Sequence, residues 1–103
     1  MTENAFRYNP ANPIILDFRG CKNIDELHLR IKETFGFPDY YGKNWDAMWD
    51  CIDGYFYQET CRIIEIQGFY SMPQELQEYC KPMWEIFRDL KAKEQNVEAR
   101  IIS

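Results

Sequence analysis

Three short apolar runs, separated by longer stretches with helical periodicity, constrain the fold of this chain more than any other feature. The runs are Ile14–Phe18 (IILDF), Arg62–Ile66 (RIIEI) and Glu98–Ser103 (EARIIS) with Val97 before it, and each is short and rich in isoleucine, as buried strands are. Strands that alternate with helices pair in parallel through crossover connections. The pattern therefore predicts a small α/β fold, in which a three-stranded parallel sheet packs with about four helices.

Capping residues and glycines mark the first two predicted helices. Asn23, with Glu26 three residues later, forms a capping box, and the apolar residues that follow recur at helical spacing up to a stop at Gly36. Asn44 is a good N-cap for a second helix, which Gly54 ends. We expect both helices to turn an apolar face towards the core.

Two prolines set the limits of the remaining helices. Ser71 and Gln74 form another capping box around Pro73, which is well placed in a first turn. A helical stripe of apolar residues runs on to Leu90, but Pro82 interrupts it. Because proline breaks the hydrogen bonding of a helix interior, we expect two successive helices in place of one straight helix.

The length of 103 residues fits a single domain over residues 1–103, and two Asn-Pro turn signals make residues 1–12 an extended or poorly ordered lead-in. No CxxC pair or Cys/His cluster is present, so neither a metal site nor a cofactor is predicted. The N-terminus lacks a secretory signal pattern, and no apolar run is long enough to span a bilayer. We expect a cytoplasmic protein with free thiols at Cys21, Cys51, Cys61 and Cys80.

Acidic residues gather in the middle of the chain. The formal net charge is −5, and the segment from Asp39 to Glu59 holds five acidic residues and one lysine, Lys43. Nucleic-acid binding depends largely on Lys and Arg neutralising phosphates, so this balance argues against a nucleic-acid partner. A localised acidic field instead speeds the encounter with a cationic surface. A basic protein is the better prediction for a partner.

The predicted second helix separates its carboxylates from its apolar residues. At about 100° per residue, Asp50 lies about 40° and Asp53 about −20° from Asp46, so the three carboxylates share one stripe. Trp49 lies beside this stripe and is a candidate for contact with a partner. Like charges one turn apart destabilise a helix, and a locally unfavourable pattern is where a functional site is expected. The residues on the opposite side are Ala47, Met48, Cys51 and Ile52.

Three further aromatic residues lie near this helix. Trp45 falls next to Ile52 on the helix, which favours core packing at the helix edge over contact with a partner. Tyr40 and Tyr41 precede Gly42 in a predicted loop, where large rings either fill the core or face a partner. We expect one of these two rings to point inward and the other outward.

Catalysis is an alternative use of clustered carboxylates. Asp46 and Asp50 could support glycosidase-like or metal-assisted chemistry if a cleft held them. The only histidine, His28, lies at the edge of the apolar face of the first helix, where a structural role is expected. No glycine-rich phosphate loop, GxSxG motif or HExxH motif is present. We therefore predict that the chain is not an enzyme, and binding and simple solubility both stay open as roles of the acidic stripe.

The segment Tyr40–Cys51 (YYGKNWDAMWDC) resembles the signature of the barstar family of ribonuclease inhibitors. The leading strand, the helix before the signature, the RIIEI strand, the Phe87–Asp89 segment and the Ile101–Ser103 end also fall in the family's order. The first dozen residues and a longer loop after Gly54 fall outside the resemblance. The resemblance implies an intracellular inhibitor whose aspartates take the places of RNA phosphates in a basic, secreted ribonuclease, barnase-like or a toxin, with no membrane or nucleic-acid partner.

The resemblance also implies which residues contact the partner. Asp50 matches the position that penetrates deepest among the basic residues of the enzyme, where charge-assisted hydrogen bonds form in a desolvated pocket. Gly42 and Gly54 match positions that let the partner approach closely. The predicted contact residues are Tyr40, Gly42, Asn44, Asp46, Trp49, Asp50, Asp53, Gly54, Tyr55 and Asp89.

Several positions near the expected interface depart from the family pattern. Lys43 replaces an acidic residue, Trp45 a leucine, Tyr55 a tryptophan and Asp53 an uncharged residue, and Asp89 is shorter than the glutamate it replaces. These changes indicate a ribonuclease different from barnase. The alternative is that the domain serves as a regulatory or structural binding module for another basic protein.

Overall fold

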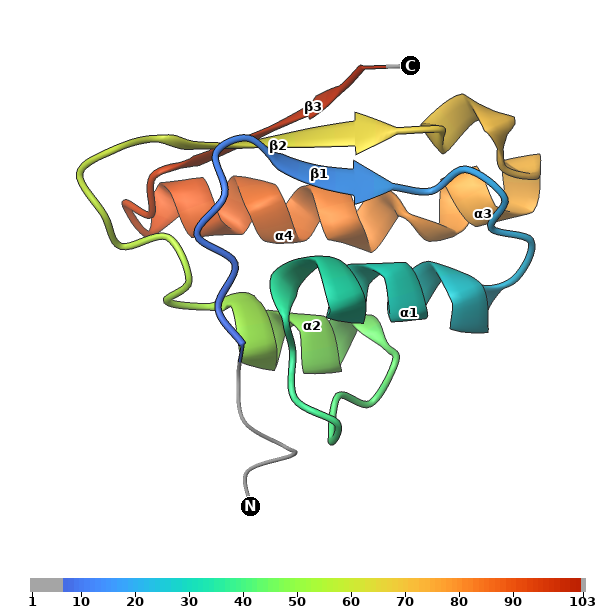
Figure 1. Ribbon diagram of the computed structural model, residues 1–103, viewed down its shortest axis with the longest axis horizontal. Coiled ribbons are helices and arrows are strands. Elements are labelled where there is room, and N and C mark those ends of the chain that lie inside the picture. The colour runs from blue at the N-terminus through green and yellow to red at the C-terminus, as the bar shows by residue number, and fades with distance from the viewer. Residues whose placement is uncertain (1–6, 103) are drawn as a thin grey trace.

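The computed structural model describes residues 7–102 and confirms the alternation of strands and helices (Figure 1). Residues 1–6 of the predicted lead-in and Ser103 lie outside the described residues. The elements in chain order are β1 (Ile14–Asp17), α1 (Ile24–Phe35), α2 (Trp45–Ile52), β2 (Arg62–Gln67), the 3-10 helix η1 (Phe69–Ser71), α3 (Gln74–Tyr79), α4 (Lys81–Ala92) and β3 (Val97–Ile101).

Within residues 7–102, the sheet has three parallel strands in the order β1-β2-β3. β2 is central, with Ile64 opposite Ile14 on one side and opposite Ala99 on the other. α1 and α2 connect β1 to β2, and η1, α3 and α4 connect β2 to β3. The predicted α/β fold with a three-stranded parallel sheet and about four helices is therefore confirmed.

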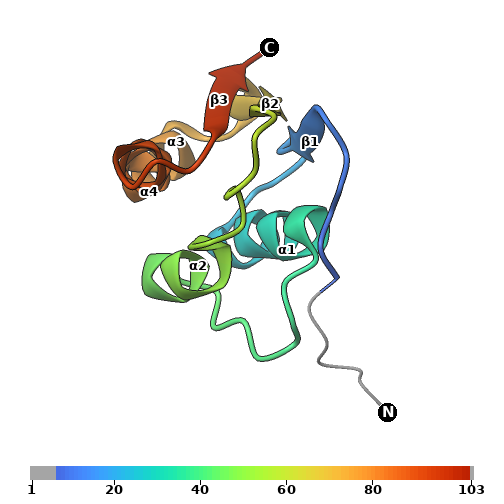
Figure 2. The same ribbon diagram turned by 90° about the vertical axis from the view of Figure 1, so that its left-hand side faces the viewer.

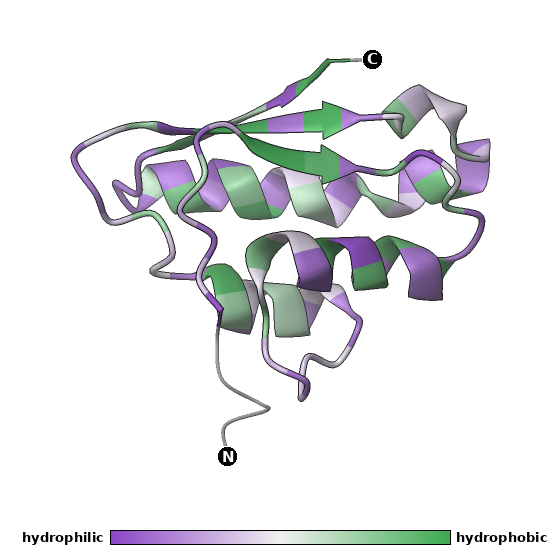
Figure 3. Cartoon of the chain, viewed as in Figure 1, coloured by the Kyte–Doolittle hydropathy of each residue, from purple (hydrophilic) through white to green (hydrophobic). Residues whose placement is uncertain are grey.

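The four α-helices α1, α2, α3 and α4 lie on one side of the sheet (Figures 1 and 2). Side chains of a strand alternate between its two faces, so every second residue reaches the helices. In β1, Ile14 and Leu16 are fully buried, whereas Ile15 between them is exposed. Ile64 and Ile66 of β2 are also fully buried. Figure 3 shows hydrophobic and hydrophilic residues alternating in the C-terminal half of β2. The other face of the sheet is left open to solvent.

Both predicted asparagine caps are confirmed. The Asn23 side chain accepts a hydrogen bond from the Glu26 N–H at 2.9 Å, and the Asn44 side chain accepts one from the Ala47 N–H at 2.8 Å. Glu26 reaches back to the N–H of Lys22 at 2.8 Å, one residue before the cap. These local bonds fix where α1 and α2 begin.

The predicted capping box at Ser71 is wrong. The Ser71 hydroxyl donates to the Gly68 carbonyl at 2.7 Å, and Ser71 belongs to η1, which the sequence did not predict. Pro73 is itself the N-cap of α3 and provides no side-chain hydrogen bond. The predicted break near Pro82 is confirmed, because α3 ends at Tyr79 and Pro82 lies in the first turn of α4. Proline is tolerated there, because the N–H groups of the first helical turn have no carbonyl partner within the helix, so the missing N–H costs no hydrogen bond.

Residues 7–12 form neither helix nor strand but are held by hydrogen bonds. The Arg7 N–H donates to the Gly36 carbonyl at 2.7 Å. Buried Arg62, at the start of β2, donates through Nε to the Ala11 carbonyl at 3.1 Å. These bonds place the lead-in beside α1 and β2.

The four cysteines carry free thiols, two of them buried, at Cys21 and Cys80, one half-buried at Cys51 and one exposed at Cys61. Burial raises the pKa of Cys80 to about 12, so this thiol stays protonated at neutral pH. Among residues 7–102, no helix has both the length and the apolar character that crossing a membrane requires.

Candidate functional site

α2 packs one face on the core and turns the other outward. Met48 and Ile52 are fully buried, and Ala47 and Cys51 pack against the core from partly buried positions. The apolar side of the helix therefore consists of the residues that helical spacing predicts. The outer face of the helix is left at the surface of the described chain.

Asp46 and Asp50 are exposed on that outer face. Neither carboxylate forms an ion pair with any residue between 7 and 102. Asp46 lies in the first turn, where the helix dipole favours an anion, whereas Asp50 lies in the second half of the helix, where it does not. Asp50 thus has neither a cation nor a helix N-terminus of its own chain to stabilise its charge.

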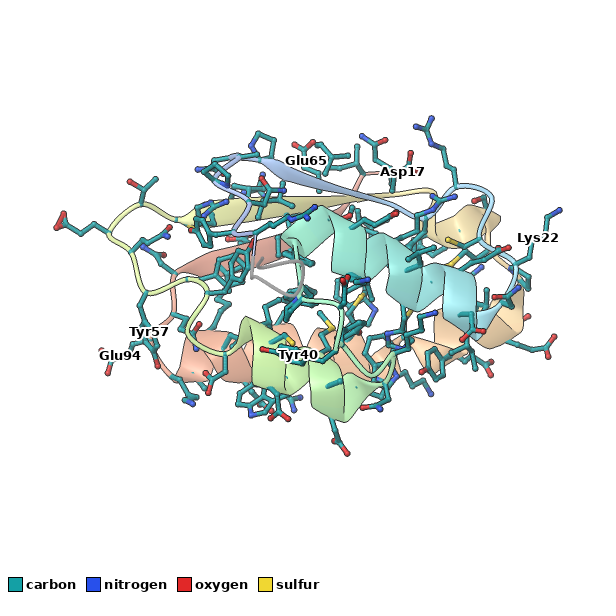
Figure 4. All side chains as sticks on the ribbon, turned by 60° about the horizontal axis from the view of Figure 1, so that its bottom comes forward. Asp17, Lys22, Tyr40, Tyr57, Glu65 and Glu94 are labelled. Carbon is teal, nitrogen blue, oxygen red and sulfur yellow. The ribbon has the colours of Figure 1, made fainter. Side chains whose placement is uncertain are left out.

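The loop before α2 presents one tyrosine and buries the other, as predicted. Tyr40 is 74% exposed (Figure 4), whereas Tyr41 is 5% exposed and belongs to the core. Gly42 and Lys43 follow at the surface, and Lys43 takes a left-handed φ of 55°. The predicted contact residue Asn44 uses its side-chain oxygen to cap α2 and donates through Nδ2 to the Gly42 carbonyl at 3.2 Å. Its amide therefore holds the loop to the helix.

Asp53, predicted as part of the acidic stripe, is neutralised within the chain. Lys93 Nζ lies 2.9 and 3.1 Å from its two carboxylate oxygens, and Gln95 donates to it at 2.9 Å. The hydrogen bond from Lys93 holds the pKa of Asp53 below its usual value. Lys93 also lies 5.2 Å above the ring of Trp49, a cation–π geometry. The uncompensated part of the stripe is therefore Asp46 and Asp50.

Tyr55, also predicted as a contact residue, has its side chain in the core, with 5% of the residue exposed. Its hydroxyl donates to the Phe35 carbonyl at 2.7 Å and accepts from the Asn9 N–H at 2.7 Å. Burial raises the pKa of Tyr55 to about 12. The ring joins the lead-in to α1, and this position corrects the expectation of a surface contact. Gly54, just before it, is exposed with a left-handed φ of 89°.

Asp89 is exposed on α4, the helix that packs beside α2. It lies four residues before Lys93, so the two side chains share one face of the helix. Since Lys93 reaches Trp49 and Asp53, this face of α4 borders the outer face of α2. The fold thus brings Asp89 to the edge of the surface formed by α2 and residues 40–44.

A buried cluster supports the start of α2 from below. His28 is fully buried, and its two ring nitrogens lie 2.7 and 2.8 Å from the hydroxyls of Tyr41 and Tyr79. The Trp45 ring packs on His28 with centroids 4.6 Å apart, and its Nε1 is buried without a partner among the described residues. Burial lowers the pKa of His28 to about 4. The structural roles expected for His28 and Trp45 agree with this packing.

The sequence did not predict Lys93 and Gln95 as part of this region. Gln95 is buried, and besides holding Asp53 it accepts from the Gly54 N–H at 3.0 Å, so it links the turn after α2 to the end of α4. Both residues lie about forty positions from Asp53 in the chain. The only local signal was the spacing of Asp89 and Lys93, one turn apart on a predicted helix.

Asp46 and Asp50 lie outside the main surface cavities of the described chain. Cavities of 640, 630 and 280 Å³ open on the surface, and none is lined by Asp46 or Asp50. Among residues 7–102, no group of three His, Cys, Asp or Glu side chains is arranged to hold a metal ion. Asp46 and Asp50, together with the exposed Tyr40 and the partly buried Trp49, form an acidic and aromatic surface on α2 and the loop before it.

Comparison with known proteins identifies relatives of the chain. The family model of barstar, described as barnase inhibitor, matches residues 11–103. A protein of Bacillus subtilis (strain 168) named "Putative ribonuclease inhibitor YrdF" is 52% identical over 42 residues, which cover 41% of this chain and 46% of the relative. The match thus spans less than half of that relative's length. Since the family model matches nearly the whole described chain, this protein belongs to the barstar (barnase inhibitor) family.

Proposed function

We propose that this chain inhibits a ribonuclease by placing Asp50 and Asp46 of α2 among the basic residues that bind RNA phosphates. The observation that carries the proposal is that these two carboxylates are exposed and have no ion-pair partner within residues 7–102. Membership of an inhibitor family, and a relative whose name refers to ribonuclease inhibition, support it.

The free carboxylates suit this role energetically. No ion pair within the described chain has to break before Asp46 or Asp50 meets a partner. Arg and Lys of a ribonuclease can donate charge-assisted hydrogen bonds to them, and these bonds strengthen when the interface excludes water. Most of the affinity in such an interface comes from a few desolvated side chains. We expect Asp50 to be the first of these.

Aromatic and glycine residues complete the proposed contact surface. Tyr40 is exposed, and the partly buried Trp49 is held by Lys93 and the core. Large, rigid rings of this kind supply much of the affinity at protein interfaces. A Cβ on Gly42 would lie 3.3 Å from Asn44 Nδ2, so any side chain there would crowd the cap of α2. Gly42 therefore supports both the loop and the close approach of a partner.

Lys43 and Lys93 define the limits of the acidic surface. Lys43 is exposed next to the loop glycine, and Lys93 covers Trp49 at the opposite end of α2. A partner with basic residues opposite Lys43 would be repelled, whereas the charge of Lys93 is already paired with Asp53. We therefore expect the partner to place neutral or acidic groups opposite Lys43. A secreted ribonuclease or ribonuclease toxin, blocked in the cytoplasm of the cell that makes it, fits this requirement.

Ribonuclease inhibition can be tested with a panel of basic bacterial ribonucleases that includes barnase. We expect stoichiometric inhibition of at least one enzyme, and loss of inhibition by the double variant Asp46→Asn/Asp50→Asn. Asparagine keeps the shape of each side chain, so an unchanged unfolding midpoint would show that the variant is folded. The proposal is contradicted if no enzyme is inhibited, or if the double variant inhibits as well as the parent chain.

A pull-down on the same protein tests the alternative that the domain binds another basic protein. If the main partner lacks nuclease activity and binding still depends on Asp50, the surface is retained but its function has changed. The proposed inhibition predicts that the captured partner hydrolyses RNA when it is released.

A further inference from the structure

β3 forms a free edge of the sheet. It pairs with β2 on one side, and no residue between 7 and 102 pairs with its other side. Edge strands that avoid pairing are usually very short, or contain proline, charged side chains or a bulge. The sequence of Val97–Ile101, VEARI, has no proline, and its register with β2 is continuous over five residues, but it contains two charged residues of opposite sign, Glu98 and Arg100.

The direction of the backbone groups shows which residues are open to a partner. The Ile102 N–H donates to Ile66 at 2.8 Å and the Asn96 carbonyl accepts from Arg62 at 2.9 Å, so the even-numbered residues bond to β2. Peptide groups alternate along a strand, so the N–H and C=O of Ala99 and Ile101 point away from the sheet. These groups form no hydrogen bond to any of the described residues.

The charges on β3 are self-complementary. Glu98 and Arg100 flank Ala99, are exposed, share the open face of the sheet and form an ion pair with each other at 3.5 Å. Pairing of two copies would exchange this intrachain pair in each copy for two pairs between the copies. In an antiparallel pair of β3 strands centred on Ala99, Glu98 of each copy lies directly opposite Arg100 of the other. Because Ala99 is then the hydrogen-bonded position, these ionic pairs fall at the positions where side chains are closest.

Glu65 extends this pattern into the second strand. It is the register partner of Arg100 in β2 and lies on the open face (Figure 4). In the paired arrangement, each Arg100 would lie between Glu65 of its own chain and Glu98 of the other copy. The row across the two sheets would alternate in charge. The small side chain of Ala99 at the centre leaves room for the strands to approach.

We propose that two copies of this chain associate through antiparallel pairing of their β3 strands, with the twofold axis at Ala99. The pairing makes one continuous six-stranded sheet from two three-stranded sheets. Such an interface is isologous and closed, so it gives a dimer and not a fibre. α4 lies between β3 and α2 (Figures 1 and 2), so we expect each copy to keep Asp46 and Asp50 accessible. The association would then not interfere with the proposed inhibition.

Sedimentation velocity over a range of concentrations tests the dimer. Five paired residues make a small interface, so we expect monomer at about 10 μM and dimer at about 1 mM. In Arg100→Glu, the new glutamate of each copy lies opposite Glu98 of the other copy, which makes two repulsive pairs. We expect this variant to raise the dissociation constant of the dimer about tenfold or more. The exchanged variant Glu98→Arg/Arg100→Glu restores opposite charges and should recover the dimer.

Two controls separate β3 pairing from other association. Lys81→Glu makes the same charge change at an exposed position on α4, and it should leave the dissociation constant unchanged. Hydrogen exchange of the Ala99 and Ile101 amides should slow as the concentration rises, and it should not slow in Arg100→Glu. A monomer at all concentrations, or a dimer that Arg100→Glu does not weaken, would overturn the proposal.

Discussion

The outer face of α2 and the residues that hold its C-terminal end contain the same kinds of side chain in different states. Asp50 is exposed and has no cation within residues 7–102, whereas Asp53, one turn later, is bound by Lys93 and Gln95. Tyr40 is largely exposed, whereas Tyr55 is buried with its hydroxyl in two hydrogen bonds. Residues that lie close together in the sequence therefore divide into a proposed contact surface, which is exposed, and an anchor, which is held by other parts of the chain.

The N-terminal end of α2 is anchored in another way. Trp45 packs on His28, which is held between the hydroxyls of Tyr41 and Tyr79. Both ends of the helix are thus fixed by contacts with distant parts of the chain. A helix fixed at both ends can carry unfavourable charges on its outer face without loss of its position, and preorganised charges bind a partner with less loss of entropy.

The difference predicts that substitutions on the two regions have separate effects. A change on the outer face should weaken binding and leave folding intact. A change in the anchors should weaken folding and leave the chemistry of the contact surface unchanged.

Asp50→Ala should have the largest effect on binding. Removing one partner of a buried, charge-assisted pair costs about 2 to 5 kcal/mol, so the dissociation constant for the ribonuclease should rise about 30-fold to several thousand-fold. The free energy of unfolding should stay within about 0.5 kcal/mol of the parent value, since Asp50 is an exposed side chain. Isothermal titration and chemical unfolding measure the two quantities.

Glu75→Ala is the matched control for Asp50→Ala. Glu75 is an exposed acid on α3 that forms no ion pair with the described residues. We expect it to change the dissociation constant by less than about threefold, since a distant surface charge acts mainly on the association rate. Equal losses in the two variants would show that net charge, and not the position of Asp50, determines binding.

The anchor at His28 predicts a dependence of stability on pH. His28 has a pKa of about 4 in the folded chain, against an ordinary value of 6.5. Between pH 4 and pH 6.5, the unfolded chain therefore binds a proton that the folded chain does not bind. The free energy of unfolding should fall as the pH decreases from 6.5 to 4. The shift corresponds to about 3 kcal/mol. The contribution is constant above pH 6.5.

His28→Gln provides the comparison for this pH dependence. Glutamine can still hydrogen-bond but does not titrate, so the variant is expected to be less stable at pH 7 and to lose the slope between pH 6.5 and 4 that His28 causes. Chemical unfolding at a series of pH values measures both. An identical slope in the variant would assign the pH dependence to other groups.

Tyr55→Phe should have a smaller effect on folding. The substitution keeps the buried ring but removes the hydroxyl from the Phe35 carbonyl and the Asn9 N–H. Leaving buried polar groups unpaired costs about 1 to 3 kcal/mol, which should lower the thermal midpoint. Affinity for the ribonuclease should change little. A large loss of affinity with unchanged stability would return Tyr55 to the contact surface.

Asp53→Asn should have the smallest effect and should appear mainly in acid. Lys93 lowers the pKa of Asp53 in the folded chain, so its contribution is present above the unfolded value of 3.8 and is lost as pH falls through the folded value. The stability difference between parent and variant should therefore shrink in strong acid. The pair is exposed, so high salt should reduce the difference at neutral pH as well.

The parts of this structure that could be predicted depend on local signals in the sequence. The asparagine caps of α1 and α2, and the break at Pro82, depend on residues within one turn, and the structure confirms them. The alternation of strands and helices was sufficient for the parallel sheet. η1 was missed because Ser71 bonds to Gly68 instead of capping a helix, a choice that the local residues do not determine.

The anchor of Asp53 could not be predicted because its partners are distant in the chain. Lys93 and Gln95 lie about forty residues away, and only the packing of α4 beside α2 brings them to Asp53. Tyr55 was assigned to the surface by resemblance to a family position, but its loop has no periodicity from which burial could be inferred. Helical spacing could place the aspartates on one stripe but not show which one was already neutralised.

The central claim is best tested by measuring affinity and stability on the same preparations of Asp50→Asn and Asp53→Asn. Both substitutions remove one negative charge from the same helix end and keep the side-chain shape. We predict that Asp50→Asn lowers affinity for the inhibited ribonuclease at least about 30-fold with no loss of stability. Asp53→Asn should lower stability and change affinity only a few-fold. Equal losses of affinity, or a larger loss in Asp53→Asn, would contradict the division of α2 into a contact surface and an anchor.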